Sequence, residues 1–216
     1  MARQLAISIF SKLANNMNKL SWLNKYAKYI AIVLFLCGIA FEIIELTGDI
    51  IKFSVTPYDI GSFVFDVGFI LMLLFGLIAK KDKVTIIALS ILKVFDGVHY
   101  PLVALQKVNN YNWSEGLANA TLILFILSAL CLFLVLVFFI CEKLTDKKIY
   151  WNLILLFLVL SAIFIFASFI VQVVDNHHNG KDWRNALESG YLSFLFLGMY
   201  FACVSVSKNE EKTVAT

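Results

Sequence analysis

The sequence predicts an all-α membrane protein, a bundle of six transmembrane helices with both termini on the cytoplasmic side. Three observations predict this fold. Hydrophobic residues make up 61% of the 216-residue chain and charged residues only 15%, whereas a soluble domain carries roughly 25% charge. The hydrophobic residues form runs close to the length of about 20 residues that a bilayer core requires. The basic residues gather in alternate loops between those runs.

The first segment, residues 1–27, is predicted to be an amphipathic helix that lies on the inner membrane surface. Its apolar residues recur at helical spacing, and its basic residues lie largely off that face. The apolar stripe consists of Ala6, Phe10, Leu13, Met17 and Leu20. A loosely ordered basic tail is the alternative, and the absence of a small-residue cleavage site argues against a secretory signal.

Residues 28–206 are predicted to form the six-helix transmembrane domain, followed by a cytoplasmic tail over 207–216. The third apolar run contains Lys93, Asp96 and His99, and Pro101 is expected to bend it or to end it early. The fourth run is long enough to imply a tilted helix. The predicted spans are 28–48, 58–79, 84–105, 116–141, 149–174 and 185–206.

The distribution of lysine and arginine sets the predicted orientation. Cytoplasmic loops carry an excess of these residues, and thirteen of the eighteen fall on one side of the predicted spans. These thirteen are Arg3, Lys12, Lys19, Lys25, Lys28, Lys80, Lys81, Lys83, Lys143, Lys147, Lys148, Lys208 and Lys212. The opposite side has Lys52, Lys107, Lys181 and Arg184. Both termini are therefore expected in the cytoplasm.

With this orientation, the polar residues of the spans lie between mid-membrane and the outer surface. Most of them are acids, and helical spacing places those of one span on one face. The eight acids of this region are Glu42, Glu45, Asp49, Asp59, Asp66, Asp96, Asp175 and Glu188. An isolated charge at the bilayer centre costs about 2.5–3.5 kcal/mol. The chain is therefore expected to offset that cost through pairing, water or a ligand, in an outward-facing acidic cavity.

The predicted ligand of this cavity is a cation, a proton or a cationic small solute, because a negative cleft of low dielectric concentrates positive charge. This makes the chain a transport-class protein of the cell membrane. Lys93 is expected to act as the counter-ion that holds the empty site. The predicted ligand-binding residues are Glu42, Glu45, Asp66, Lys93, Asp96, His99, Gln172 and Asp175.

Three other interpretations remain open. The buried charges can have a purely structural role, because ion pairs between membrane helices also hold the helices together. The chain, which has no nucleotide-binding motif, can be an accessory or scaffold subunit of a larger membrane complex. It can also be a metal- or haem-dependent membrane enzyme, with His99, His177 and His178 as candidate ligands. No sequence pattern predicts catalytic residues, and no basic patch interleaved with aromatic residues predicts nucleic-acid binding.

In length and helix count, and in the Ala27-x-x-x-Ala31 spacing near the start of the first span, the chain is similar to the substrate-capture subunits of energy-coupling-factor vitamin transporters. That resemblance implies an architecture and a docking face at the two alanines, and it carries no binding residues. The four cysteines all fall in apolar runs without metal-type spacing, so free thiols are expected. The Lys-, Asn- and Ile-rich composition is typical of an AT-rich bacterial genome and favours a bacterial plasma membrane.

Overall fold

The computed structural model describes residues 21–51, 57–109, 116–145, 147–181 and 186–214. This part of the chain is helical throughout apart from short turns. The helices are α2 (Ser21–Ile51), α3 (Pro57–Ile78), α4 (Asp82–Asn109), α5 (Gly116–Thr145), α6 (Lys148–His178) and α7 (Leu187–Val214). The predicted amphipathic helix over residues 1–27 lies almost entirely outside the described residues.

Five segments of these helices are long and apolar enough to cross a membrane. They lie within α2, α4, α5, α6 and α7. The described apolar portion of α3, Phe63–Ile78, is shorter than a full span. The all-α fold is confirmed and is compatible with a helical membrane bundle, in which five of the six predicted spans have the length and composition of a membrane helix.

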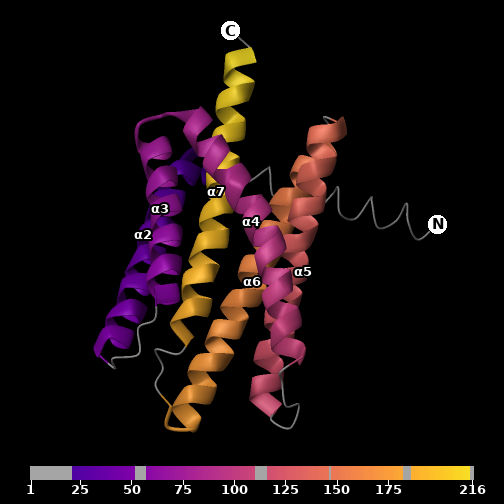
Figure 1. The fold of residues 1–216 in the computed structure, drawn as a ribbon. Coiled ribbons are helices and arrows are strands. Elements are labelled where there is room, and N and C mark those ends of the chain that lie inside the picture. The colour runs from indigo at the N-terminus through magenta and orange to yellow at the C-terminus, as the bar shows by residue number, and fades with distance from the viewer. Residues whose placement is uncertain (1–20, 52–56, 110–115, 146, 182–185, 215–216) are drawn as a thin grey trace, which may run out of the picture.

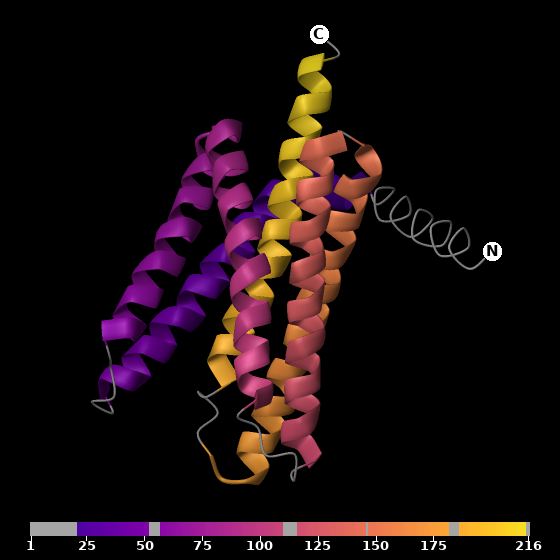
Figure 2. The same ribbon diagram turned by 45° about the vertical axis from the view of Figure 1, so that its right-hand side comes forward.

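The six helices form a bundle in which α7 is the central element (Figures 1 and 2). It packs against α2 on one side and α6 on the other, and it also contacts α4. In its most apolar stretch 78% of the residues are buried within the fold, against 17% in α2. The helices α5 and α6 pack along each other, and α3 lies against α2 and α4.

Glycines on α7 allow this central helix to receive aromatic rings from α2. A Cβ atom at Gly198 would lie 2.6 Å from the ring of Phe35, and one at Gly190 would lie 2.6 Å from the ring of Phe41. Phe35 is fully buried, and Phe41 makes an edge contact with Phe194 at 5.1 Å between ring centroids. The small residues therefore set the close approach of α2 to α7.

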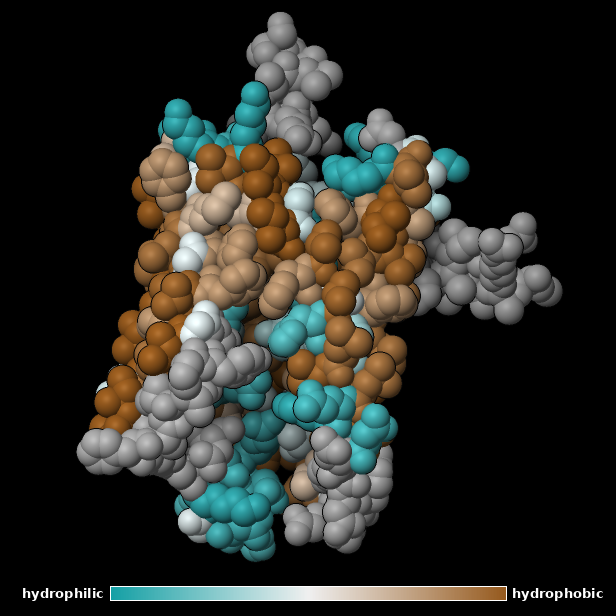
Figure 3. Space-filling view, viewed as in Figure 1, coloured by the Kyte–Doolittle hydropathy of each residue, from teal (hydrophilic) through white to brown (hydrophobic). Residues whose placement is uncertain are grey.

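The two ends of the bundle differ in the connections that they hold. The end of α7, the α3–α4 turn and the neighbouring ends of α5 and α6 share one end, which we call the C-terminal end, and the starts of α3, α5 and α7 share the opposite end (Figure 1). Hydrophobic residues cover most of the middle of the face in Figure 3, and hydrophilic residues gather toward both ends. Hydrophilic residues also extend into a hollow in its lower half, toward the opposite end.

Two helices end in the same hydrogen-bonded turn. At the end of α3 the Lys81 N–H donates to the Gly76 carbonyl at 2.8 Å, and at the end of α6 the Lys181 N–H donates to the Asn176 carbonyl at 2.7 Å. Each turn needs a residue with positive φ, which is Lys80 (φ 56°) in the first and Gly180 (φ 63°) in the second. The second turn fixes the last turns of α6, where Asp175 lies.

The helix α4 continues through Pro101 to Asn109. The proline therefore does not end the third span early. Its ring nitrogen has no hydrogen to donate to the carbonyl of Gly97, four residues earlier. Proline is tolerated in such helices because neighbouring groups satisfy the freed carbonyl. In Figure 1, α4 lies beside α3 in its first half and beside α5 in its second.

The alanine spacing on α2 serves packing within the bundle. Ala27 and Ala31 are both fully buried in the hydrophobic core. A docking face for another subunit at these two alanines was the expectation, and their burial shows that the chain's own helices already cover them.

Candidate functional site

Three of the predicted acids come together from three different helices. Glu42 of α2 and Asp96 of α4 each lie within electrostatic range of Asp66 of α3. Helical spacing put each acid on one face of its own helix, and the packing of α3 against both α2 and α4 turns these faces toward one another. We call Glu42, Asp66 and Asp96 the acidic cluster.

The deepest member of the acidic cluster is Asp96. It is only 3% exposed, and its Oδ2 atom has no hydrogen-bond partner among the residues that the structure describes. A buried carboxylate oxygen without a partner is costly. Such atoms are rare in native structures and mark strain, water or a bound group. Asp96 is therefore the residue of the acidic cluster that most strongly indicates a ligand-binding site.

Two tyrosines complete the surroundings of the acidic cluster. Tyr100 and Tyr191 each lie within electrostatic range of both Asp66 and Asp96. The Tyr191 hydroxyl is buried and, in the described part of the chain, has no hydrogen-bond partner. Sequence reasoning missed both residues, although Tyr100 follows Asp96 by one helical turn and Tyr191 follows Glu188 by one turn. That spacing was the available signal.

The exposure of the acids increases from the interior toward the surface. Asp96 is buried, Glu42 and Asp66 are half-buried, and Glu188 in the first turn of α7 is exposed. Glu42 also lies within electrostatic range of Glu45 and Glu188. The side chains of Asp49 and Asp59 lie outside the described residues. The acids thus form a graded series from the middle of the bundle toward its opposite end.

Lys93, one helical turn before Asp96 on α4, has aromatic neighbours. Its ammonium lies 4.9 Å from the centroid of the Trp151 ring and 5.2 Å from that of Phe139, and it contacts the Cys203 thiol. These neighbours belong to α6, α5 and α7. Lys93 is 4% exposed, and contact with aromatic faces is one way in which a buried ammonium is stabilised. These neighbours do not include Asp66 or Asp96, and the role of Lys93 as their counter-ion stays a prediction.

The three histidines do not form a metal centre in the described part of the chain. His99 stacks on Phe95 at 5.2 Å between ring centroids and meets Tyr100 edge-on. His177 and His178 are exposed in the last turn of α6. No group of three or more His, Cys, Asp or Glu residues within the described ranges is arranged to hold a metal ion.

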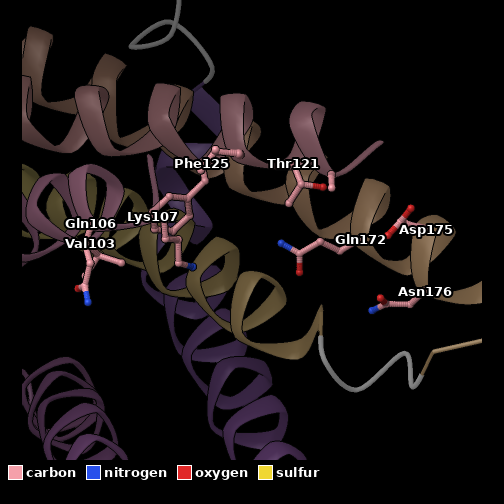
Figure 4. Close-up of a pocket in the computed structure, with 10 residues that line it drawn as sticks. Val103, Gln106, Lys107, Thr121, Phe125, Gln172, Asp175 and Asn176 are labelled. Atoms are coloured by element: carbon pink, nitrogen blue, oxygen red, sulfur yellow. The ribbon is translucent and has the colours of Figure 1, made fainter. Parts of the chain in front are cut away.

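Gln172 and Asp175 lie apart from the acidic cluster, in a pocket between α4, α5 and α6. Its volume is about 590 Å³, and Lys107, Thr121 and Phe125 also line it (Figure 4). Neither Glu42, Asp66 nor Asp96 lines this pocket. Gln172 and Asp175 therefore line a pocket to which the acidic cluster does not contribute.

Ser161, Ser168, Gln172 and Asp175 form a polar stripe along α6, and most of this stripe is hydrogen-bonded to neighbouring helices. The Ser161 hydroxyl is 2.7 Å from the Ser128 hydroxyl of α5, and the Ser168 hydroxyl donates to the Thr121 carbonyl at 3.4 Å. Gln172 Nε2 donates to Ser189 of α7 at 3.0 Å. Such bonds join membrane helices. The stripe therefore joins α6 to α5 and α7, and only its last part faces a pocket.

Comparison with known proteins finds no match to this chain among protein-family models, curated proteins or solved structures.

Proposed function

We propose that this chain is a membrane protein of the transport class that binds a proton or a cationic solute at the acidic cluster. The single observation that carries the proposal is the buried Asp96 carboxylate, whose Oδ2 atom has no partner among the described residues while a second acid lies within electrostatic range. Neighbouring carboxylates repel one another when ionised, and a shared proton or a bound cation removes that repulsion.

The ligand class follows from the spacing and the surroundings of the acids. The described acids are not arranged to contact one metal ion in a group of three. Tyr100 and Tyr191 offer aromatic faces and hydroxyl oxygens near the carboxylates. An alkylammonium group uses both, through charge-assisted hydrogen bonds and contact with the rings. A proton or a primary ammonium therefore suits the cluster better than a bare metal ion.

The proposed access is from the outer side of the membrane. The lysine-rich α3–α4 and α5–α6 turns share the C-terminal end of the bundle, with Lys80, Lys81, Lys147 and Lys148 all exposed. The positive-inside rule assigns this end to the cytoplasm. The acids become more exposed toward the opposite end, so a ligand would reach Asp96 past Glu188 and Glu42.

Equilibrium binding to the purified protein tests this proposal. Calorimetric titrations would use the chlorides of sodium, potassium, ammonium and ethylammonium, in buffers of different ionisation enthalpy so that linked proton exchange is detected. We expect saturable binding of ethylammonium or measurable proton exchange. Asp96→Asn should abolish both, because it removes the deepest negative charge and keeps the side-chain volume. Tyr191→Phe should weaken binding without removing charge.

Asp82→Asn is the matched control, because Asp82 lies in the first turn of the same helix and outside the cluster. It should bind as the wild-type chain does. A folded wild-type protein that neither binds any of the four cations nor exchanges protons would overturn the proposal and favour an accessory subunit. Unchanged binding by Asp96→Asn would also overturn it.

A further inference from the structure

The pocket between α4, α5 and α6 carries opposite charges at its two ends. Lys107 stands at one end and Asp175 at the other, with Gln172 between them (Figure 4). Within the described residues no ion pair joins Lys107 to Asp175, although both line the same pocket. Two opposite charges held apart across a cavity match a ligand that carries both charges itself.

The volume of the pocket suits a small molecule. Ligand pockets in proteins measure about 300–1,000 Å³, and this one measures about 590 Å³. Its polar lining is accompanied by the apolar side chains of Val103, Leu122 and Phe125. A short hydrocarbon linker between two charged groups would pack against these side chains.

The positive end of the pocket is held in place by an aromatic ring. The Lys107 ammonium lies 4.3 Å from the centroid of Phe125, a residue that is itself 6% exposed. A lysine in contact with a ring face keeps its three N–H donors. Lys107 is thus positioned beside the pocket with its donors available to an anionic group.

The negative end of the pocket has the Asp175 carboxylate, and the Gln172 amide lies between it and Lys107 (Figure 4). Asp175 Oδ1 accepts a hydrogen bond from Asn179 at 3.0 Å, which orients the carboxylate at the end of α6. Gln172 Nε2 donates to Ser168 at 3.3 Å and to Ser189 at 3.0 Å. Because both N–H groups of this amide are engaged, its oxygen remains as an acceptor. A carboxylate and an amide oxygen together suit a primary ammonium.

We propose that this pocket binds a small zwitterion, with its ammonium group held by Asp175 and Gln172 and its anionic group held by Lys107. The site is separate from the acidic cluster and does not rest on the function proposed for that cluster. Two sources present this chemistry, a free solute such as an aminoalkyl carboxylate or phosphate, and the headgroup of phosphatidylethanolamine. The same three side chains recognise either one.

The test uses the full chain in nanodiscs of phosphatidylcholine, whose headgroup lacks a primary ammonium. Calorimetric titration with phosphoethanolamine and with 4-aminobutyrate should show saturable binding. Ethanolamine and butyrate, which each keep one charge, should bind about tenfold more weakly or worse, as expected for the loss of one charge-assisted hydrogen bond. In a second arm, native mass spectrometry after reconstitution with phosphatidylethanolamine measures whether one lipid is retained per chain.

Two variants identify the pocket as the binding site. Lys107→Met removes the anion partner and should weaken zwitterion binding, or lipid retention, by about tenfold or more. Ala118→Leu fills the pocket without changing its charge and should have the same effect. Lys181→Met is the matched control, because Lys181 is an exposed lysine near the end of α6 that does not line the pocket.

The arms separate the two sources of the ligand. Soluble zwitterions that bind in phosphatidylcholine and are displaced by phosphatidylethanolamine identify the lipid headgroup as a competing occupant, and binding that the lipid leaves unchanged identifies a free solute. The proposal is overturned if neither soluble zwitterion binds and no phosphatidylethanolamine is retained. It is also overturned if Lys107→Met and Ala118→Leu both bind as the wild-type chain does.

Discussion

Asp96 and Lys93 lie one helical turn apart on α4, and their surroundings are opposite. Asp96 lies among other acids and two tyrosines, whereas the Lys93 ammonium lies between the rings of Trp151 and Phe139. A lysine side chain is long enough to carry its charge away from its own backbone position. The two charges therefore belong to different polar groups of the bundle.

This separation predicts the behaviour of Lys93→Met. Methionine has a similar length and can pack against the same two rings, so the chain should fold and its cation affinity at the acidic cluster should change far less than in Asp96→Asn. Calorimetric titration with ethylammonium in the two variants makes the comparison. If Lys93→Met abolished binding as completely as Asp96→Asn, Lys93 would be part of the binding site after all.

For single residues, the sequence predicts where a side chain lies on its own helix better than it predicts which side chains of other helices are its neighbours. The spacing of Glu42 and Glu45, and the depth of Asp96, followed directly from helical geometry. The side chains that face Lys93 did not, because Trp151 and Phe139 come from helices whose placement depends on the packing of the whole bundle. For the same reason Gln172 and Asp175 are predicted to lie with Glu42, although they line a pocket to which Glu42 does not contribute.

Among the helices, α4 contributes residues to both candidate sites, with Asp96 in the acidic cluster and Lys107 in the pocket. Its first half lies against α3 and its second half against α5. Gly97, next to Asp96, marks the close approach to α5, where a Cβ atom would lie 2.5 Å from Leu136 Cβ and 3.1 Å from the backbone oxygen of Leu132. A backbone oxygen cannot move away from an added Cβ atom by a side-chain rotation, as the end of a flexible side chain can.

Gly97→Ala should therefore destabilise the bundle by about 1–3 kcal/mol, the usual cost of overpacking. Gly68→Ala is the matched control, because a Cβ at Gly68 of α3 meets nothing within 4 Å. Alanine forms helices better than glycine by about 1 kcal/mol, so the control should be neutral or slightly stabilising. The free energy of unfolding of both variants is measured in detergent. Equal stability of Gly97→Ala and Gly68→Ala would contradict the close packing of α4 against α5 at Gly97.

The helices themselves were largely predictable. Hydropathy placed spans at 58–79 and 116–141, where the structure has α3 (Pro57–Ile78) and α5 (Gly116–Thr145). Runs of apolar residues define such helices without reference to their neighbours. The extension of α4 through Pro101 was not predictable in this way, because the surroundings of a helix decide whether a proline ends it.

For the whole molecule, the main feature is the separation of charge along the bundle. Exposed lysines of two turns share the C-terminal end, and the acids become more exposed toward the opposite end. The two candidate sites are linked by one ring contact, since Tyr100, near Asp96, meets Phe125 of the α4–α5–α6 pocket edge-on at 6.4 Å between ring centroids.

The proposed orientation predicts which residues are reachable from outside a cell. In a parent without its four cysteines, Lys181→Cys should react with a membrane-impermeant thiol reagent added to intact cells. Lys81→Cys should react only after the membrane is permeabilised, because the positive-inside rule assigns its turn to the cytoplasm. The cysteine-free parent controls for background labelling. The reverse pattern would show that the acids open toward the cytoplasm.

The central claim is that the acidic cluster takes up a proton or a cationic solute from one side of the membrane. Charge movement in proteoliposomes adsorbed on a solid-supported membrane tests it most directly, by a rapid step in pH or in ethylammonium concentration. We expect a transient current in the wild-type chain and in Asp82→Asn, and none in Asp96→Asn. An equal current in Asp96→Asn, or no current in the folded wild-type chain under either step, would contradict it.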